Sequence, residues 1–167
     1  MNFATSLQNQ PINMLAMKRV LYYAIPIALC FVVGWTAMLF QRESLAEWYP
    51  TLAKPVITPP NKLFPIAWSI IYICMGLSIG RLLALGDRRF VWLWVLQLLL
   101  NFLWSPMFFA IESPIAGLAI IVMLDIAVLS YAIVTWRASH FASLLMLPYL
   151  AWLGLATYLN FYIWLYN

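Results

Sequence analysis

Five long runs of apolar residues, separated by short polar or charged stretches, dominate the sequence. They lie near 20–40, 64–85, 90–111, 115–136 and 143–165. Each run is long enough to cross a hydrocarbon core of roughly 30 Å as an α-helix, which takes about 20 residues. None shows the period-two alternation of a membrane β-strand. The pattern predicts an all-α integral membrane protein, in which a polar N-terminal tail at 1–19 precedes one domain at 20–167, a bundle of five transmembrane helices.

Composition agrees with this interpretation. The 167 residues are 66% hydrophobic and 8% charged, with a mean hydropathy of +0.92, which excludes an ordinary soluble domain. The first run follows Lys18 and Arg19 and is too long for the apolar part of a signal peptide. No small-residue cleavage site precedes Gln41. We therefore expect this run to remain as the first span.

Charge predicts the orientation of the protein. With five spans, the N-terminal tail and the second and fourth loops share one side of the membrane. They carry Lys18, Arg19, Arg81, Arg88, Arg89 and Arg137 against Asp87. The other side balances Arg42, Lys54 and Lys62 with an equal number of glutamates. The positive-inside rule then places the N-terminus in the cytoplasm and the first loop outside. The N-terminus lacks a mitochondrial type of targeting segment, which favours a bacterial cell membrane. No basic patch with interleaved aromatics suggests a nucleic-acid partner.

The connector after the first span has an unusual composition. The stretch WYPTLAKPVITPPNKLFPIAW at 48–68 contains five prolines and aromatic residues at both ends. A connector that only turns the chain in water needs a few polar residues. Proline fixes the backbone angle φ, so this stretch is predicted to hold a definite shape.

Three spans carry polar and aromatic side chains at spacings of three or four residues, which place them on one face of each helix. The members are Trp68 and Tyr72 in the second span, Gln97, Asn101, Trp104 and Phe108 in the third, and Tyr149, Trp152, Ala156 and Asn160 in the fifth. All three faces are expected to converge under the first loop, as the aromatic walls of a small-molecule cavity. As an alternative, the amides of Gln97, Asn101 and Asn160 would only join helices by hydrogen bonds.

Other residues in the spans have structural interpretations. Four tryptophans near span ends are expected to form an interfacial belt: Trp92, Trp94, Trp136 and Trp164. Gly76 and Gly80 form a G-x-x-x-G pattern that predicts close helix packing, within one chain or between two. Asp125 is the one acidic residue well inside a span, and the sequence assigns it no role.

The sequence offers little for conventional catalysis. Its one histidine, His140, lies in a predicted loop beside Arg137. There is no H-E-x-x-H motif, no phosphate-binding glycine loop, no cysteine pair at metal-ligand spacing and no nucleophile elbow. We expect no catalytic residue of these kinds, no metal site and no obligatory cofactor.

Three blocks resemble one known family: WYPTLAKPVITPPNKLFPIAWSIIY at 48–72, QLLLNFLWSPMFF at 97–109 and PYLAWLGLATYLNFYIW at 148–164. On these blocks the sequence resembles the tryptophan-rich sensory protein (TspO) family, also called translocator proteins or peripheral benzodiazepine receptors. The resemblance implies a five-helix bundle, commonly a homodimer, that binds porphyrins, haem-related tetrapyrroles and, in some members, sterols or synthetic flat ligands. It also implies that the loop at 41–63 is a lid over the pocket. Carried over by motif position, the pocket residues are Trp48, Tyr49, Trp68, Tyr72, Asn101, Trp104, Trp152, Ala156 and Asn160.

The first functional hypothesis is a membrane receptor that senses, sequesters or transports porphyrins, with porphyrin or haem as a ligand and membrane lipid around it. One alternative is a light-dependent porphyrin-degrading enzyme that uses Trp68 and Trp152. Another is a transporter of sterols or other small molecules. Phe161 replaces the tyrosine of the animal sterol motif, which weighs against sterol transport.

Overall fold

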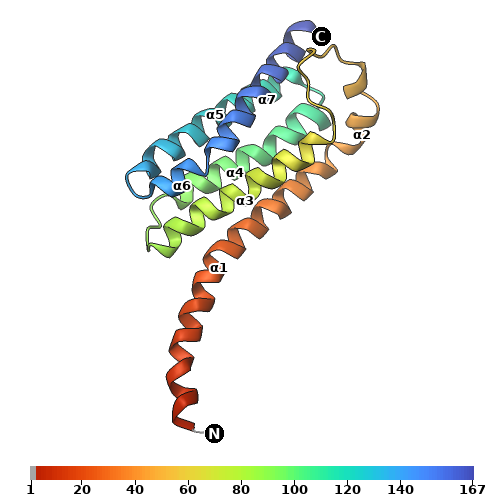
Figure 1. Ribbon diagram of the computed structural model, residues 1–167. Helices are drawn as coiled ribbons and strands as arrows, with labels where there is room; N and C mark the ends of the chain where they lie inside the picture. The colour runs from red at the N-terminus through yellow and green to blue at the C-terminus, as the bar shows by residue number, and fades with distance from the viewer. Residues whose placement is uncertain (1–2) are drawn as a thin grey trace.

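The computed structural model describes residues 3–167, so residues 1 and 2 of the expected N-terminal tail lie outside the described part. Its long helices are α1 (Phe3–Leu39), α3 (Leu63–Ala84), α4 (Val91–Ser105), α5 (Pro114–Trp136) and α7 (Leu147–Tyr166) (Figure 1). Its short elements are α2 (Arg42–Ala46), the 3-10 helix η1 (Tyr49–Thr51), the π-helical turn η2 (Pro106–Ala110) and α6 (His140–Leu144). The described residues contain no strand, and the predicted all-α fold is confirmed.

Five helical stretches of the described residues are long and apolar enough to cross a membrane. They are Ala16–Leu39, Leu63–Ala84, Val91–Ala110, Pro114–Trp136 and His140–Tyr166. The chain is therefore an integral, multi-pass membrane protein, as the hydropathy pattern predicts. The bundle of five transmembrane helices is confirmed.

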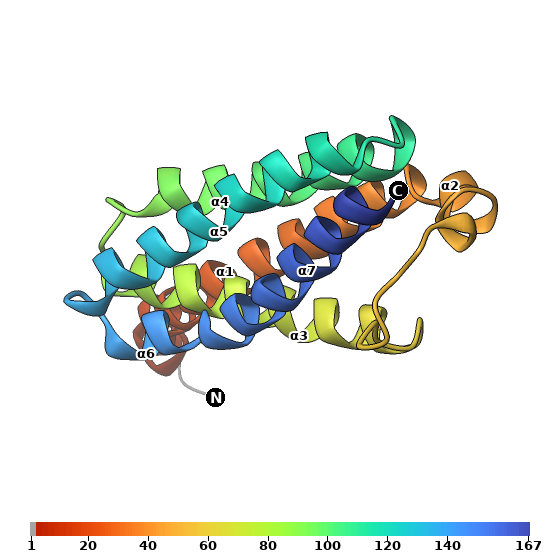
Figure 2. The same ribbon diagram turned by 90° about the horizontal axis from the view of Figure 1, so that it is seen from above.

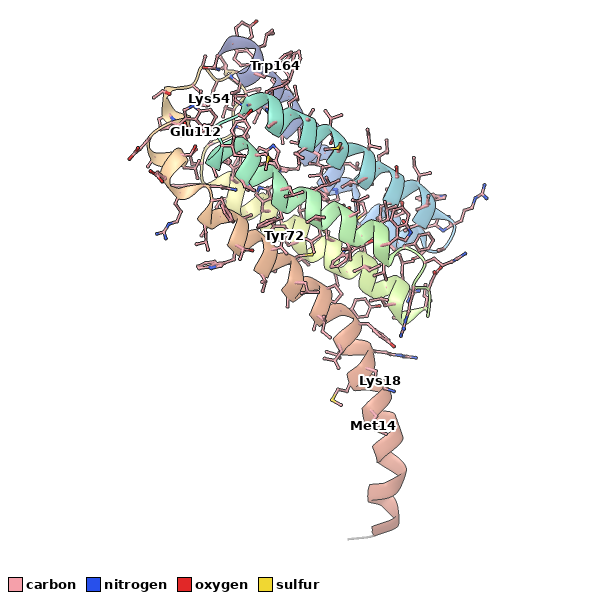
Figure 3. All side chains as sticks on the ribbon, turned by 180° about the vertical axis from the view of Figure 1, so that it is seen from behind. Met14, Lys18, Lys54, Tyr72, Glu112 and Trp164 are labelled. Atoms are coloured by element: carbon pink, nitrogen blue, oxygen red, sulfur yellow. The ribbon has the colours of Figure 1, made fainter. Side chains whose placement is uncertain are left out.

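The first helix is longer than the span that hydropathy predicts. The expected tail is helical from Phe3 and continues without a break into the span. Figure 1 shows these early turns projecting from the bundle, and Figure 3 labels Met14 and Lys18 on the projection. Residues such as Met17 and Lys18 favour helix, so the helix continues on the N-terminal side of the predicted start of the span at 20.

The five long helices form a closed ring. Around it, α1 contacts α3, α3 contacts α7, α7 contacts α5, α5 contacts α4, and α4 returns to α1. The helices alternate in direction, so α1, α4 and α7 end where α3 and α5 begin (Figure 2). The connection between α1 and α3, residues 40–62, lies at this end and is called the first loop below. Five separate chain segments can thus contribute side chains to one site beneath it.

Buried polar groups at the end of the ring away from the first loop are hydrogen-bonded across helices. The Ser78 hydroxyl donates to the carbonyl of Ala142 at 2.6 Å and lies 3.1 Å from the Tyr131 hydroxyl. Ser143 donates to the carbonyl of Ala132, also at 2.6 Å. These bonds fix α3, α5 and α6 to one another, because an unpaired polar group is costly where water is absent.

The interfacial belt prediction is wrong for Trp94. Trp92 is 66% exposed, whereas Trp94 is 4% exposed and donates its indole N–H to the carbonyl of Met75 at 3.1 Å. Two residues along a helix turn the side chain by about 200°, so neighbouring tryptophans at one membrane depth point to opposite sides. Trp94 is a core residue that joins α4 to α3.

The G-x-x-x-G pattern packs within the chain. A Cβ atom built on Gly80 would lie 2.8 Å from the carbonyl oxygen of Tyr22, and one on Gly76 would overlap Ile27. Both neighbours belong to α1. These glycines therefore let α1 approach α3 closely, and they carry no evidence for association between two chains.

Candidate ligand-binding site

A cavity of about 530 Å³ lies inside the ring of helices, beneath the first loop. Its size falls within the roughly 300 to 1,000 Å³ of typical small-molecule sites. Side chains from α1, the first loop, α3, α4, η2, α5 and α7 line it. Among the described residues that line it, Lys54 carries the one formal charge, and most of the others are apolar or aromatic.

Eight of the nine residues expected in the pocket line this cavity. They are Tyr49, Trp68, Tyr72, Asn101, Trp104, Trp152, Ala156 and Asn160. The faces of α3, α4 and α7 thus meet where the spacing predicts, although the role of these residues in binding a ligand stays a prediction. Trp48 does not line the cavity: its ring packs edge-on against Phe108, with centroids 5.6 Å apart. Trp48 anchors the first loop to the bundle.

One side of the cavity is an aromatic wall built by α3 and α7. Trp68 stacks on Tyr72, with ring centroids 5.5 Å apart and planes inclined by 30°. The edges of Tyr149 and Trp152 meet Trp68 at 6.0 Å and 6.5 Å, and Phe64 meets Trp152 at 5.4 Å. Stacked and edge-to-face pairs of this kind stabilise one another and hold the rings in fixed orientations. The wall therefore presents flat apolar faces to the cavity.

The π-helical turn η2 shapes the opposite wall. Pro106 lacks an N–H group and cannot donate to the carbonyl of Phe102. Further along, the amide of Ile111 donates to the carbonyl of Pro106, five residues back, at 2.9 Å, which is the π-helical spacing. Beside this turn, Trp104 stacks on Phe108 with centroids 5.3 Å apart and planes inclined by 18°. The turn also carries Phe109, whose ring contacts Tyr49 of the first loop at 5.7 Å.

The two asparagines of the site hold its walls together. Asn101 donates to the hydroxyl of Tyr149 at 2.7 Å, which joins α4 to α7. Asn160 accepts the indole N–H of Trp104 at 3.0 Å and donates to the carbonyl of Pro114 at 2.8 Å. Both thus line the cavity and form the interhelical bonds considered as an alternative. Gln97, one turn before Asn101, is fully buried, and neither amide atom has a hydrogen-bond partner among the described residues.

The first loop folds into a compact cover with its own contacts. The Lys54 ammonium donates to the carbonyls of Tyr49 at 2.6 Å and Leu52 at 3.0 Å, which closes the loop around η1. Asn167, which follows the last residue of α7, accepts the amide N–H of Ala53 at 2.8 Å and donates to its carbonyl at 3.3 Å. Burial raises the pKa of the Tyr49 phenol above its usual value. The loop is held over the cavity mouth by α7 on one side and by η2 on the other.

Helix α1 also lines the cavity, a contribution that was not expected from the sequence. Gly34, Ala37 and Gln41 line the cavity at spacings of three and four residues, a small and polar face that a helical plot would have shown. Gly34 is needed for the shape of the site because a Cβ atom there would overlap the ring of Tyr72. Gln41 donates to the hydroxyl of Ser105 and so joins the end of α1 to α4.

Two ionisable residues singled out in the sequence lie away from the cavity lining. Asp125 on α5 is half-buried and accepts the hydroxyl of Thr157 on α7 at 2.7 Å. His140 is exposed at the start of α6, in place of the predicted loop, where its ring meets the edge of Trp136 at 4.4 Å. The hydroxyl of Ser139 caps α6, which explains why helix begins there.

The ring of helices around a loop-covered cavity defines a multi-pass membrane protein with an internal cavity of the size of a small molecule. The chain belongs to the TspO/MBR family, whose sequence model matches residues 26–165. It is 40% identical over 149 residues to the tryptophan-rich protein TspO of Chlorobaculum tepidum, covering 86% of this chain and 94% of that protein. It is 32% identical over 136 residues to the tryptophan-rich sensory protein of Cereibacter sphaeroides, covering 81% and 84%. The translocator protein of Homo sapiens is 31% identical over 141 residues, covering 81% of each chain. The family resemblance of the three sequence blocks is confirmed.

Proposed function

We propose that the protein binds porphyrins and related flat tetrapyrroles in the cavity beneath the first loop, in order to sense, sequester or move them. The observation that carries the proposal is the pair of aromatic walls, Trp68 with Trp152 on one side and Trp104 with Phe108 on the other. A flat conjugated ring gains stacking and apolar contact from such walls. The names of the relatives, a sensory protein and a translocator protein, support a role in which binding leads to a signal or to movement.

Ala156 provides the sharpest test of this site. Its methyl group lies one turn beyond Trp152 and lines the cavity, so Ala156→Leu fills space that the ligand is expected to occupy. The variant should lose about 1 to 3 kcal/mol of binding free energy by overpacking. Trp152→Phe should lose about 0.5 to 1.5 kcal/mol of stacking.

The measurement is quenching of tryptophan fluorescence by protoporphyrin IX in detergent or nanodiscs, with thermal stability followed in parallel. Trp164→Phe is the matched control, since Trp164 is 42% exposed and does not line the cavity. Equal affinities of the wild type and a folded Ala156→Leu variant would show that porphyrin does not occupy this cavity.

A second candidate function is light-dependent degradation of the bound porphyrin. It is favoured by Trp68 and Trp152, whose rings both line the cavity 6.5 Å apart and so would lie close to the ligand as redox-active groups. Illumination of the complex distinguishes the two functions. Loss of the porphyrin spectrum with formation of a defined product, abolished by Trp68→Phe and Trp152→Phe, would establish chemistry. Flux of porphyrin or sterol into proteoliposomes tests transport.

A further inference from the structure

Lys54 is the feature of the cavity that stacking on aromatic walls leaves unexplained. It is the charged residue of the described lining, and its side chain is half-buried with the ammonium 4.7 Å from the centre of the Tyr49 ring. Figure 3 shows Lys54 at the loop end of the bundle, with Tyr72 deeper among the helices. We propose that Lys54 binds an anionic group on the edge of the ligand, so that the site selects flat hydrophobic acids over their neutral esters. This inference rests on the proposed function.

The positive charge of Lys54 is not neutralised within the described chain. Arg89 and Asp87 form the one ion pair among the described residues, so no carboxylate lies within 4.0 Å of the Lys54 ammonium. The ammonium has three N–H donors. Two make short bonds to carbonyls, and the third carbonyl, that of Pro50, lies at 3.5 Å. A ligand oxygen can therefore replace the longest contact without breaking the other two.

The polarity of the cavity orients the ligand. Its deep lining includes Ile121, Leu124 and Leu153, which are buried and apolar. The amides of Asn101 and Asn160 are already hydrogen-bonded to neighbouring helices, whereas Lys54 lies under the loop at the mouth. An acidic edge at Lys54 would place the apolar part of the ring against α5 and α7. A charge beside an apolar cavity is costly unless a counter-charge pairs with it, and the ligand supplies one.

A purely structural role for Lys54 is the competing explanation, because its ammonium also bonds the backbone of the first loop. The two explanations differ in their dependence on the charge of the ligand. A structural lysine supports binding of acids and esters alike, whereas an anion-binding lysine supports acids alone.

The test measures the affinity of protoporphyrin IX and of its dimethyl ester for three proteins: the wild type, Lys54→Met and Lys62→Met. Lys62 lies on the same loop but is exposed and outside the lining, so it controls for loss of a nearby charge. Each ligand partitions into detergent equally in all three samples, so comparison between proteins removes that effect. Lys54→Met should weaken binding of the acid about tenfold and leave binding of the ester within about twofold. Lys62→Met should change neither.

Each other outcome overturns the inference. Equal weakening of acid and ester by Lys54→Met would mean that the lysine only holds the loop. Unchanged affinities for both would mean that it contacts no anionic group of the ligand. In either case, porphyrin binding by the wild type and its loss in Ala156→Leu would still support the proposed function. The proposed function fails by a different result, namely if the wild type binds neither compound. Lys54→Arg, which keeps the charge, should retain most of the affinity for the acid.

Discussion

Trp104 on α4 and Asn160 on α7 are joined across the cavity by the indole N–H, which donates to Oδ1 of the amide at 3.0 Å. The same amide donates to the carbonyl of Pro114 at the start of α5. One side chain thus connects three of the five long helices at the level of the site. Together with the stacking of Trp104 on Phe108, this bond holds the Trp104 ring in the cavity wall.

A double-mutant cycle of Trp104→Phe and Asn160→Leu should show a favourable coupling free energy of about 0.6 to 2 kcal/mol, the range for hydrogen bonds between membrane helices. The measurement is the free energy of unfolding in mixed detergent. Trp92→Phe, at an exposed position on the same helix, should show no coupling with Asn160→Leu. Independent effects of the first pair would mean that the bond contributes nothing to the fold.

Gly80→Leu should lower the free energy of unfolding by about 1 to 3 kcal/mol or more, because the new side chain meets the backbone of Tyr22. Gly154→Leu is the control: Gly154 is exposed on α7, and a Cβ atom there has no neighbour within 4 Å. Thermal unfolding in nanodiscs measures both. A homodimer, which we propose from the family resemblance, should still cross-link in any Gly80→Leu protein that remains folded. Loss of the dimer with unchanged stability would place this glycine between two chains.

Gln97→Leu should raise stability by about 1 to 3 kcal/mol, since the substitution removes two buried amide atoms that have no partner among the described residues. Asn101→Leu, one turn further along α4, should lower stability because it leaves the Tyr149 hydroxyl without its donor. Both variants replace an amide by leucine on neighbouring turns of α4. Opposite changes in stability therefore cannot come from the loss of helix polarity that the two variants share. A loss of stability in Gln97→Leu would contradict the assignment of Gln97 as unsatisfied.

Asn167→Ala should speed release of bound porphyrin several-fold, because it removes both bonds between α7 and Ala53 and frees one side of the first loop. Stopped-flow recovery of tryptophan fluorescence measures the release. Tyr166→Phe changes an exposed neighbour and should release the ligand at the wild-type rate. Identical rates in the two variants would show that the loop does not limit release.

The charge asymmetry gives the orientation that we propose. A cysteine placed at Val56, which is fully exposed on the first loop, should react with an impermeant maleimide in intact cells. A cysteine at Arg88, in the exposed link between α3 and α4, should react only after the membrane is opened. The background is low because Cys30 is buried and Cys74 is partly buried. The reverse labelling pattern would invert the topology.

The residues that were placed well from sequence are those whose neighbours lie on the same helix. Trp152, Ala156 and Asn160 share one face by spacing alone, and that face lines the cavity. Burial depends in addition on how each helix is rotated toward its partners, and local sequence does not encode this rotation. For this reason Trp92 and Trp94 looked alike in sequence and differ in the structure.

Trp48 illustrates a second limit. Trp48 packs against Phe108, which lies in the π-helical turn that begins at Pro106 after the end of α4. Such a contact between a loop and a helix end far along the chain has no periodic signal. The small residues Gly34 and Ala37 of α1 were missed because their contribution is the space they leave for Tyr72 and the ligand.

The bonds that α7 makes to the rest of the bundle have a consequence for biosynthesis. Asn160 and Asn167 connect α7 to Trp104 and to Ala53, partners that are synthesised much earlier. A nascent chain that has inserted only the first four spans therefore has no closed site, and the ring faces of Trp68 and Trp104 remain open on one side. Since α7 is the span inserted after the other four, the cavity becomes enclosed only when this last helix packs against α3 and α5.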